Sequence, residues 1–488
     1  MPTISPELKH LLLVTFCVYV AVMYALAFWA QGRIKTEEDF LVAGRRLPLS
    51  LAWMTLLATW FGAATLLTVA EEVRDKGVRA AALDPFGAGV CLLLAGAFLA
   101  GPMWRQKILT IPDLFRQHYG PIAETICSLI MIPSYFGWIA VQFTALAGML
   151  HLFFQLPMSW GIVLVAAIGT GYTLMGGMWS VTLTDAVQIT LVLFGLLVLG
   201  PVVVWHVGEG SFSSGLQRLF NETPRSLLTV IPRNSRSEFT DWLGLFAAGA
   251  FGNLVAQDLM QRVFAARSER TAKYACFVAG VAYLSFGWIP IGLGLSARIL
   301  FPDSTGSVLP TLASSFLHPA LAVLFTVSIL SAVLSTIDSA ILSPASILSH
   351  NLFARVCRVN HLTLNRWAIV LIALASVTLA LLGEDAYRLL ELSYEMPFVG
   401  LLVPMLAAAW GRGQRGRESA ALASMAAGIV IWGAHLVMGS EYFLDHIAFF
   451  QRWQFPIGIT ATLVSATVFG ILSCMSSRDS APNVRQPD

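Results

Sequence analysis

A succession of long apolar segments limits the fold of this chain more than any other feature. Hydrophobic residues make up 57% of the 488 residues and charged residues only 12%, which lies outside the range of soluble domains. A helix needs roughly 20 apolar residues to cross about 30 Å of hydrocarbon. Thirteen windows meet this requirement, near residues 10–31, 48–70, 81–104, 121–151, 158–176, 179–206, 239–264, 272–300, 317–349, 365–383, 387–411, 418–438 and 453–475. The sequence therefore predicts an all-α membrane protein with about 13 transmembrane helices.

The basic residues predict the orientation. With these boundaries all 30 Lys and Arg residues fall in loops, tails or helix ends, so we expect no basic side chain in the middle of the membrane. With the N-terminus outside, the inner loops, among them 262–273, and the C-terminal tail carry 19 of the 30. This asymmetry follows the positive-inside rule, although the long outer loop 207–238 carries four arginines against it. We expect a multi-pass protein of the cell (inner) membrane with its N-terminus outside and its C-terminus inside.

Composition argues against several classes of function. A net charge of +2 with dispersed basic residues disfavours nucleic-acid binding, and the six cysteines lack the paired spacing of a disulfide framework or metal site. The sequence contains no GxxxxGK[ST] loop to bind a nucleotide and no polar stretch long enough for a soluble domain. We therefore expect a transporter driven by an ion gradient. It is expected to act as a monomer in the lipid bilayer, without an organic cofactor and not as an enzyme.

Two of the spans contain features of helices that break inside the membrane. The second span places Thr59, Gly62 and Thr65 in its middle, and the seventh places Gly249, Gly252 and Asn253 there in the same way. Broken helices expose backbone carbonyls and amides, which a membrane tolerates only where they line a cavity. The second and seventh spans would open two inverted repeats, comprising spans two to six and seven to eleven. The alternative is that the glycines serve close helix packing.

The ninth span carries a group of small and hydroxyl residues on one helical face. Ala332, Ser335 and Thr336 stand at i, i+3 and i+4. Two hydroxyls together with carbonyls from a broken helix opposite would supply the oxygen ligands that Na⁺ needs without a buried charge. The alternative is that both hydroxyls bond back to carbonyls of their own helix, as they often do in membranes.

Several local stretches are similar to the sodium:solute symporter family, whose members carry sugars, proline, carboxylates, vitamins or choline. The stretches that carry the resemblance are EEDFLVAGRRLPLS, LLATWFGAATLL, LTIPDLFRQHYG, YTLMGGMWSVTLTDAVQ, AQDLMQRVFAARS and SAVLSTIDSAILSPASIL. The resemblance implies a five-plus-five inverted-repeat core of the leucine-transporter type with flanking helices. The expected organisation is an N-terminal helix and cytoplasmic loop (1–47), a first repeat (48–206), an extracellular loop (207–238), a second repeat (239–411), C-terminal helices (412–476) and a cytoplasmic tail (477–488).

The resemblance also implies a sodium site and a coupling residue. Carried over by motif, the backbone carbonyls of Ala58 and Phe61 would bind Na⁺ together with Ala332, Ser335 and Thr336. Asp185 in WSVTLTDAVQ matches an acidic position that the family associates with sodium coupling or gating. The alternative for Asp185 is a carboxylate at a helix N-terminus.

The solute is expected at mid-membrane, beside the break in the second span. Because no basic residue is expected in the core, cationic or neutral solutes are favoured over carboxylates. The candidate wall residues come from four spans and are Thr59, Trp60, Gly62, Asp84, Phe86, Trp138, Gln142 and Gln257.

Part of this wall resembles the choline-carrier branch, in which aromatic rings enclose a quaternary ammonium. Trp60 and Trp138 match two of these rings, whereas Ala88 and Ala256 stand where two further aromatic residues are expected. Half of the cage is therefore missing, and packing is an equal alternative for the two tryptophans. We expect sodium-coupled symport of a small organic solute into the cell by alternating access, the solute being a choline-like amine, amino acid, sugar or carboxylate. The rivals are a solute sensor of the same fold, which would bind without transporting, and a channel or scaffold.

Overall fold

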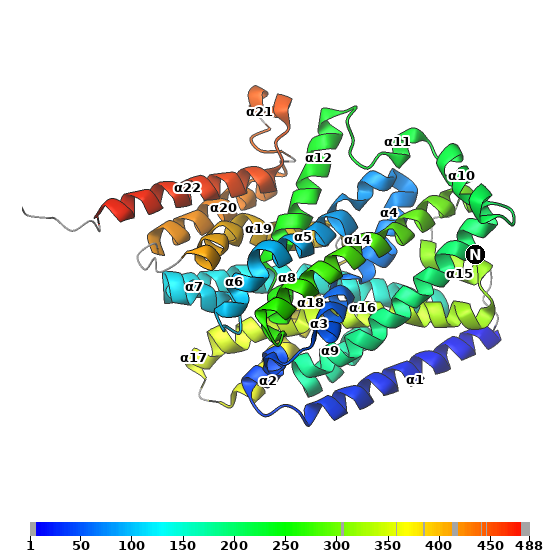
Figure 1. Cartoon of the computed structure of the whole chain (residues 1–488), viewed down its shortest axis with the longest axis horizontal. Coiled ribbons are helices and arrows are strands. Elements are labelled where there is room, and N and C mark those ends of the chain that lie inside the picture. Colours follow the sequence, from blue (N-terminus) through cyan, green and yellow to red (C-terminus); the bar gives the residue numbers. More distant parts are fainter. Residues whose placement is uncertain are drawn as a thin grey trace, which may run out of the picture.

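The computed structural model describes residues 6–303, 307–357, 359–383, 386–411, 418–440, 442–445 and 447–479. Its regular secondary structure in these ranges is helical, apart from one isolated pairing of Leu47 with Ala266. Figure 1 shows the helices of both halves of the chain packed into one body. Part of the predicted tail (480–488) and the loop 412–417 lie outside the described residues, while the last helix continues to Asp479.

The α-helices fall into two groups on either side of residue 230. Those of the first group are α1 (Pro6–Gln31), α2 (Glu37–Val42), α3 (Leu49–Trp60), α4 (Val69–Lys76), α5 (Ala88–Leu94), α6 (Ala100–Arg105), α7 (Ile111–Tyr119), α8 (Pro121–Phe154), α9 (Met158–Val207), α10 (Phe212–Glu222) and α11 (Arg225–Leu228). Those of the second group are α12 (Arg236–Ala247), α13 (Gln257–Ala265), α14 (Glu269–Leu300), α15 (Val308–Phe316), α16 (Pro319–Ile347), α17 (Ala354–Val356), α18 (His361–Leu382), α19 (Ala386–Trp410), α20 (Glu418–Met438), α21 (Ala448–Trp453) and α22 (Ile457–Asp479).

Short 3₁₀-helical and π-helical segments extend or join these helices. They are η1 (Ala43–Arg45), η2 (Ala64–Thr68), η3 (Val78–Ala81), η4 (Ala82–Gly87), η5 (Ala95–Leu99), η6 (Ala248–Gly252), η7 (Asn253–Val255) and η8 (Leu348–Phe353).

Ten described helices are long and apolar enough to cross a membrane, and two bent helix pairs bring the number to twelve. The sequence predicts thirteen, and the difference lies in α9. A continuous helix of 50 residues would be about 75 Å long, more than twice the thickness of the hydrocarbon. However, α9 breaks at Gly177, whose φ is +47° and where a Cβ atom would lie 2.5 Å from the carbonyl oxygen of Phe40. This break separates the predicted spans 158–176 and 179–206.

Both predicted broken helices are bent. The segments Leu49–Trp60 and Ala64–Lys76 meet at 58°, and Arg236–Val255 and Gln257–Ala265 meet at 47°. These are the second and seventh predicted spans, so the mid-span glycines mark breaks as well as close packing.

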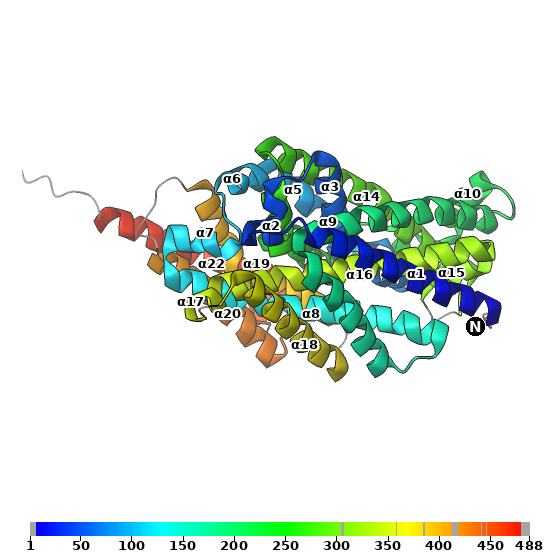
Figure 2. The ribbon, with the colours of Figure 1, turned by 90° about the horizontal axis from the view of Figure 1, so that it is seen from below.

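Helix α16 forms the centre of the body, where it packs against α3, α8, α9 and α18. Helices α1 and α9 lie along it, as Figure 2 shows from below. In contrast, α1, α20 and α22 bury only 28% of their most apolar windows, so they flank the core and present apolar side chains outward. This arrangement surrounds the hydroxyl-rich helix α16 with both bent pairs and α9.

One basic residue, Arg262, lies in the last turn of a helix and not in the loop predicted for it. This residue was placed in the loop 262–273, but it lies within α13 and is 2% exposed. Its guanidinium lies 3.5 Å from the carboxylate of Asp185 on α9, which neutralises the buried charge. The partner is far away in the sequence, so a count of charges along the chain could not reveal the pair.

Candidate functional site

The second span breaks between α3 and η2, where its residues are buried. Across the break, the amide of Phe61 bonds to the carbonyl of Leu57 at 2.8 Å, and the amide of Leu66 bonds to that of Gly62 at 3.0 Å. Neither bond uses the carbonyl of Ala58 or Phe61, and both residues are buried. These two carbonyls are the ones proposed from the sequence as sodium ligands, and a broken helix end needs polar partners of this kind.

The break lies directly against the hydroxyl-bearing face of α16. A Cβ atom added to Gly62 would stand 2.2 Å from Oγ1 of Thr336 and 3.3 Å from Oε1 of Gln142. Gln142 accepts a hydrogen bond from the amide of Ala63 at 3.2 Å, so its side chain caps the second half of the broken helix. Thr336 also donates to the carbonyl of Ala332 at 3.2 Å. The structure therefore brings Thr336 to the broken helix, as the spacing predicts.

Ser335 has a different partner from Thr336. Its hydroxyl donates to the carboxylate of Asp185, which also accepts from Thr55. Arg262 donates to the hydroxyl and carbonyl of Thr55 at 3.1 Å and to Ser339 at 2.6 Å. A buried carboxylate, a buried guanidinium and three hydroxyls thus form one polar cluster beside the broken helix. Asp185 belongs to this cluster and is fully buried, in contrast to a carboxylate at an exposed helix end.

Two more polar side chains complete this cluster. Thr59 donates to the carbonyl of Thr55 at 2.8 Å and to Ser339 at 3.2 Å. Asp338 accepts from Ser339, and its second carboxylate oxygen is buried with no hydrogen-bond partner among the described residues. Thr59 therefore belongs to the polar cluster.

A narrow cavity lies between α8, α19 and the bent seventh span. Its wall includes Tyr135 and Trp138 of α8, Asn253 and Asp258 of the bent span, and Tyr394 of α19. About 20 Å³ of it admits the centre of a water molecule, which is room for about one water. The cavity is thus too small for an organic solute, which requires its walls to move apart.

The wall residues proposed from the sequence divide between this cavity and its surroundings. Trp138 lines the cavity, and Trp60 reaches its edge by donating from Nε1 to Asp258 at 2.6 Å. Asp84 lies elsewhere: it accepts from Thr65 at 3.0 Å and from Tyr283 at 2.8 Å. Those contacts hold the third predicted span to the second span and to α14.

Two proposed wall residues point away from the cavity. The ring of Phe86 packs on Trp288 of α14, with ring centroids 5.3 Å apart. Gln257 accepts from the amide of Ile111 at 2.8 Å and donates to the carbonyl of Leu109 at 3.2 Å. Gln257 therefore joins the start of α13 to the start of α7, whereas its neighbour Asp258 faces the cavity.

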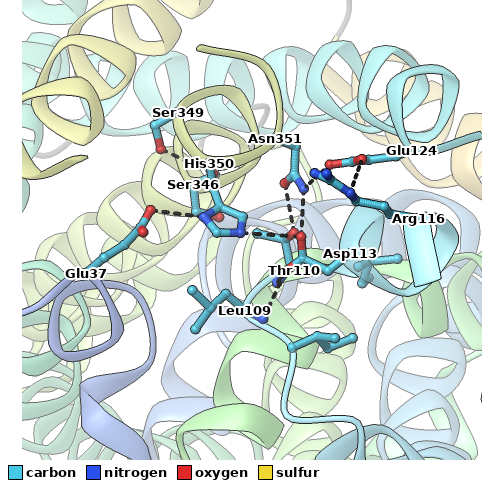
Figure 3. Close-up of polar contacts among 12 residues, drawn as sticks. Glu37, Leu109, Thr110, Asp113, Arg116, Glu124, Ser346, Ser349, His350 and Asn351 are labelled. Carbon is cyan, nitrogen blue, oxygen red and sulfur yellow. Dashed lines mark hydrogen bonds and ion pairs between the residues drawn. The ribbon is translucent and has the colours of Figure 1, made fainter. Parts of the chain in front are cut away.

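A second polar cluster lies at the far end of α16, on the predicted cytoplasmic side. Figure 3 shows His350 between two carboxylates, at 3.0 Å from Glu37 and 3.3 Å from Asp113. Asn351 donates to Asp113 at 2.8 Å and to Glu124 at 2.9 Å. These contacts tie η8, which continues α16, to α2, α7 and α8.

Two carboxyl groups of this second cluster, Glu37 and Asp113, have lowered pKa values. Burial acts to raise the pKa of Glu37, but the hydrogen bond and charge of His350 outweigh it and lower the pKa. The pKa of Asp113 is lowered in the same way, against burial, by His350 and by backbone amides at the start of α7. Both groups are therefore ionised at neutral pH and hold His350 by charge as well as by hydrogen bonds.

Comparison with known proteins assigns the family. The sequence matches the model of the sodium:solute symporter family over residues 40–410. The chain belongs to this family. It is 25% identical over 512 residues to the high-affinity choline transporter 1 of Caenorhabditis elegans, covering 96% of this chain and 85% of that protein. It is 26% identical over 430 residues to the human high affinity choline transporter 1, covering 82% and 73% of the two chains.

Solved structures confirm the predicted fold. A Na⁺-coupled sialic acid symporter in a substrate-bound outward-open state superposes with a TM-score of 0.76 at 18% identity, covering 96% of this chain and 98% of that one. A nucleobase-cation-symport-1 family transporter in a closed conformation gives a TM-score of 0.59 at 14% identity, covering 90% and 95%. In its described residues this chain therefore has the all-helical leucine-transporter type of fold that the sequence predicts.

Several residues of the site have no binding or coupling role predicted from the sequence. Asp258 and Tyr135 line the cavity, and Arg262 and Asp338 join the cluster around Asp185. The available signal was the presence of ionisable residues inside predicted spans, which marks functional sites in membranes. Asp258 is one such residue, since it stands within the seventh predicted span, 239–264.

Proposed function

We propose that this symporter carries a small organic solute into the cell together with Na⁺ by alternating access. The observation that carries the proposal is the broken second span, whose Gly62 lies against the Thr336 hydroxyl of α16. Ala58 and Phe61 lie just before Gly62 at this break. Na⁺ would be held there by the carbonyls of these two residues with Ala332, Ser335 and Thr336. The N-terminus would lie outside and the C-terminus inside, in the cell membrane, and a monomer would suffice.

Energy for uptake would come from the sodium gradient and the membrane potential. Each net positive charge that moves inward gains about 2.3 kcal/mol per 100 mV. The narrow cavity supports a transport cycle in which its walls move apart to admit the solute, because these walls belong to different elements that can separate. Asp185 would couple the two ligands through its bonds to Ser335 and Thr55.

The first experiment identifies a solute and its dependence on sodium. Purified protein is screened by thermal shift against amines, amino acids, sugars and carboxylates, in NaCl and in KCl. Each hit is then tested for uptake into proteoliposomes with and without an inward sodium gradient. We expect uptake that requires the gradient. Equal uptake without sodium would refute coupling, and binding without uptake would identify a solute sensor of the same fold.

The second experiment tests the sodium site. The double variant Ser335→Ala with Thr336→Ala removes two hydroxyl groups and leaves the backbone carbonyls of the break. We expect its stabilisation by NaCl to require at least about tenfold more sodium than that of the wild type, because two ligands are lost. Unchanged sodium dependence would exclude this site.

A further inference from the structure

A buried carboxylate faces the narrow cavity between α8, α19 and the bent seventh span. Asp258 is 1% exposed and is one of the residues that line the cavity. Its two oxygens are held separately: Tyr135 donates to Oδ1 at 2.7 Å and Trp60 donates from Nε1 to Oδ2 at 2.6 Å. The two donors are neutral, and they fix the direction of the carboxylate without neutralising its charge.

The nearest guanidinium on the same helix is directed elsewhere. Arg262, one turn further along α13, donates to the backbone carbonyl of Asp258 at 2.9 Å. Its other nitrogens meet Thr55 and Ser339, and it pairs with Asp185. Within the described part of the chain the Asp258 carboxylate forms no ion pair, and none of the residues that line the cavity is basic.

An unneutralised carboxylate in a buried site is costly unless a cation can reach it. Each carboxylate oxygen offers about two acceptor positions, so both oxygens of Asp258 keep capacity beyond the bonds from Tyr135 and Trp60. The cavity also presents the rings of Tyr135, Trp138 and Tyr394, whose faces attract cations. A positively charged group is the ligand that satisfies both the carboxylate and the rings.

A larger cavity next to the first has the same sign of charge. It encloses about 570 Å³ and is lined by Asp241, Glu391 and Glu395 together with a single basic residue, Arg388. Helix α19 contributes to both cavities, with Glu391 and Glu395 on one and Tyr394 on the other. The carboxyl groups of this second cavity outnumber its one guanidinium, so its lining does not favour an anion.

We propose that Asp258 is the counter-ion for the charged group of the transported solute, which is a small organic cation with no carboxylate of its own. This inference rests on the proposed transport function and names its substrate class. Zwitterions and anions are disfavoured because no basic side chain in the cavity wall would meet a carboxylate.

The experiment compares cations with neutral molecules of the same shape. Choline is paired with 3,3-dimethylbutan-1-ol, and N,N-dimethylethanolamine with 3-methylbutan-1-ol. Binding to the full-length protein in detergent and NaCl is measured by calorimetry. For at least one pair we expect the cation to bind at least about tenfold more tightly than its neutral partner. Neutral partners that bind as well as the cations would overturn the proposal, as would a screen whose tightest ligand is a sugar, zwitterion or carboxylate.

The variant Asp258→Asn keeps the size and an acceptor oxygen but removes the charge. We expect it to lose the cation preference while its stabilisation by NaCl stays at the wild-type level. Asp303→Asn, which removes the same charge from an exposed turn after α14 that lines neither cavity, should keep the preference. Asp258→Glu, which restores the charge, should recover part of it. Wild-type cation affinity in Asp258→Asn would overturn the assignment.

These outcomes separate the inference from the transport function. Sodium-driven uptake of an uncharged solute would preserve the transport function and refute the role of Asp258. Cation binding that depends on Asp258, without uptake, would preserve the binding role and refute transport. Because the wild-type comparison needs no substitution, the inference stays testable even if Asp258→Asn fails to fold.

Discussion

Substitution of Gly62 by alanine tests whether the break in the second span and Thr336 form one sodium site. The added Cβ atom would stand 2.2 Å from Oγ1 and 3.0 Å from Cβ of Thr336, well inside normal contact distance. Thr336 cannot yield easily, since it is 1% exposed and its branched side chain has few rotamers in a helix. Overpacking of this kind costs about 1–3 kcal/mol. If that cost falls on the sodium-bound state, the dissociation constant for sodium rises by about 5- to 150-fold.

The assay is thermal unfolding of purified Gly62→Ala in detergent over a series of NaCl concentrations at constant ionic strength. The matched control is Gly148→Ala in α8, where an added Cβ atom would meet nothing within 4 Å. That control should keep the wild-type sodium dependence and be as stable as the wild type or slightly more stable, because alanine favours a helix over glycine. The reasoning is refuted if Gly62→Ala responds to sodium at the same concentrations as Gly148→Ala and the wild type.

Two further predictions concern the polar clusters. Asp185→Asn leaves the guanidinium of Arg262 buried beside a neutral amide, and we expect a loss of about 3–5 kcal/mol in unfolding free energy. Adding Arg262→Gln should recover part of that loss in denaturant unfolding, and a fully additive effect would contradict the pairing. Glu37 and Asp113 have lowered pKa values in the folded protein. Their contribution to the free energy of unfolding is therefore complete above their ordinary pKa values of 4.5 and 3.8. It is lost as the pH falls through the lowered pKa values of the folded protein. These two groups should therefore leave the melting temperature unchanged from pH 7 to about 5 and lower it below about pH 4. Glu37→Gln should reduce that fall in melting temperature. An unchanged fall would exclude the role of Glu37.

Features that depend on neighbouring residues could be predicted from the sequence. The spans follow from runs of apolar residues, and the two bends follow from glycines such as Gly62 and Gly252 inside those runs. The helical spacing of Ala332 and Thr336 predicts their common face, and Thr336 meets the break at Gly62. The hydroxyl of Thr336 also donates back to the carbonyl of Ala332, which is the bond that the alternative interpretation expects. In these cases the partners are either on the same helix or follow from the pairing of the two repeats.

Features that depend on distant partners could not be predicted in this way. Ser335 is adjacent to Thr336 in the sequence, yet its hydroxyl turns to Asp185, because successive residues of a helix point about 100° apart. Gln257 and Asp258 show the same effect, since the first joins α7 and the second faces the cavity. No local pattern in the sequence distinguishes Gln257 from Asp258. Only the rotation of α13 relative to its neighbours decides which of these side chains faces the cavity.

The two candidate ligand sites share a continuous set of contacts. Trp60, which bonds to Asp258, directly precedes Phe61 at the break of the second span. Arg262 bonds to the backbone of Asp258 and to the carboxylate of Asp185, and Asp185 accepts from Ser335. A cation at Asp258 would therefore act on α3 and α13. Both of these helices contact α16, which carries the hydroxyls proposed to bind sodium. Coupling between two sites is reciprocal, so the factor by which sodium tightens cation binding must equal the factor by which the cation tightens sodium binding. If this set of contacts carries the coupling, both effects have to pass through the ion pair of Arg262 and Asp185. It joins α13, which carries the cavity carboxylate, to α9, whose Asp185 accepts a hydrogen bond from Ser335 of α16.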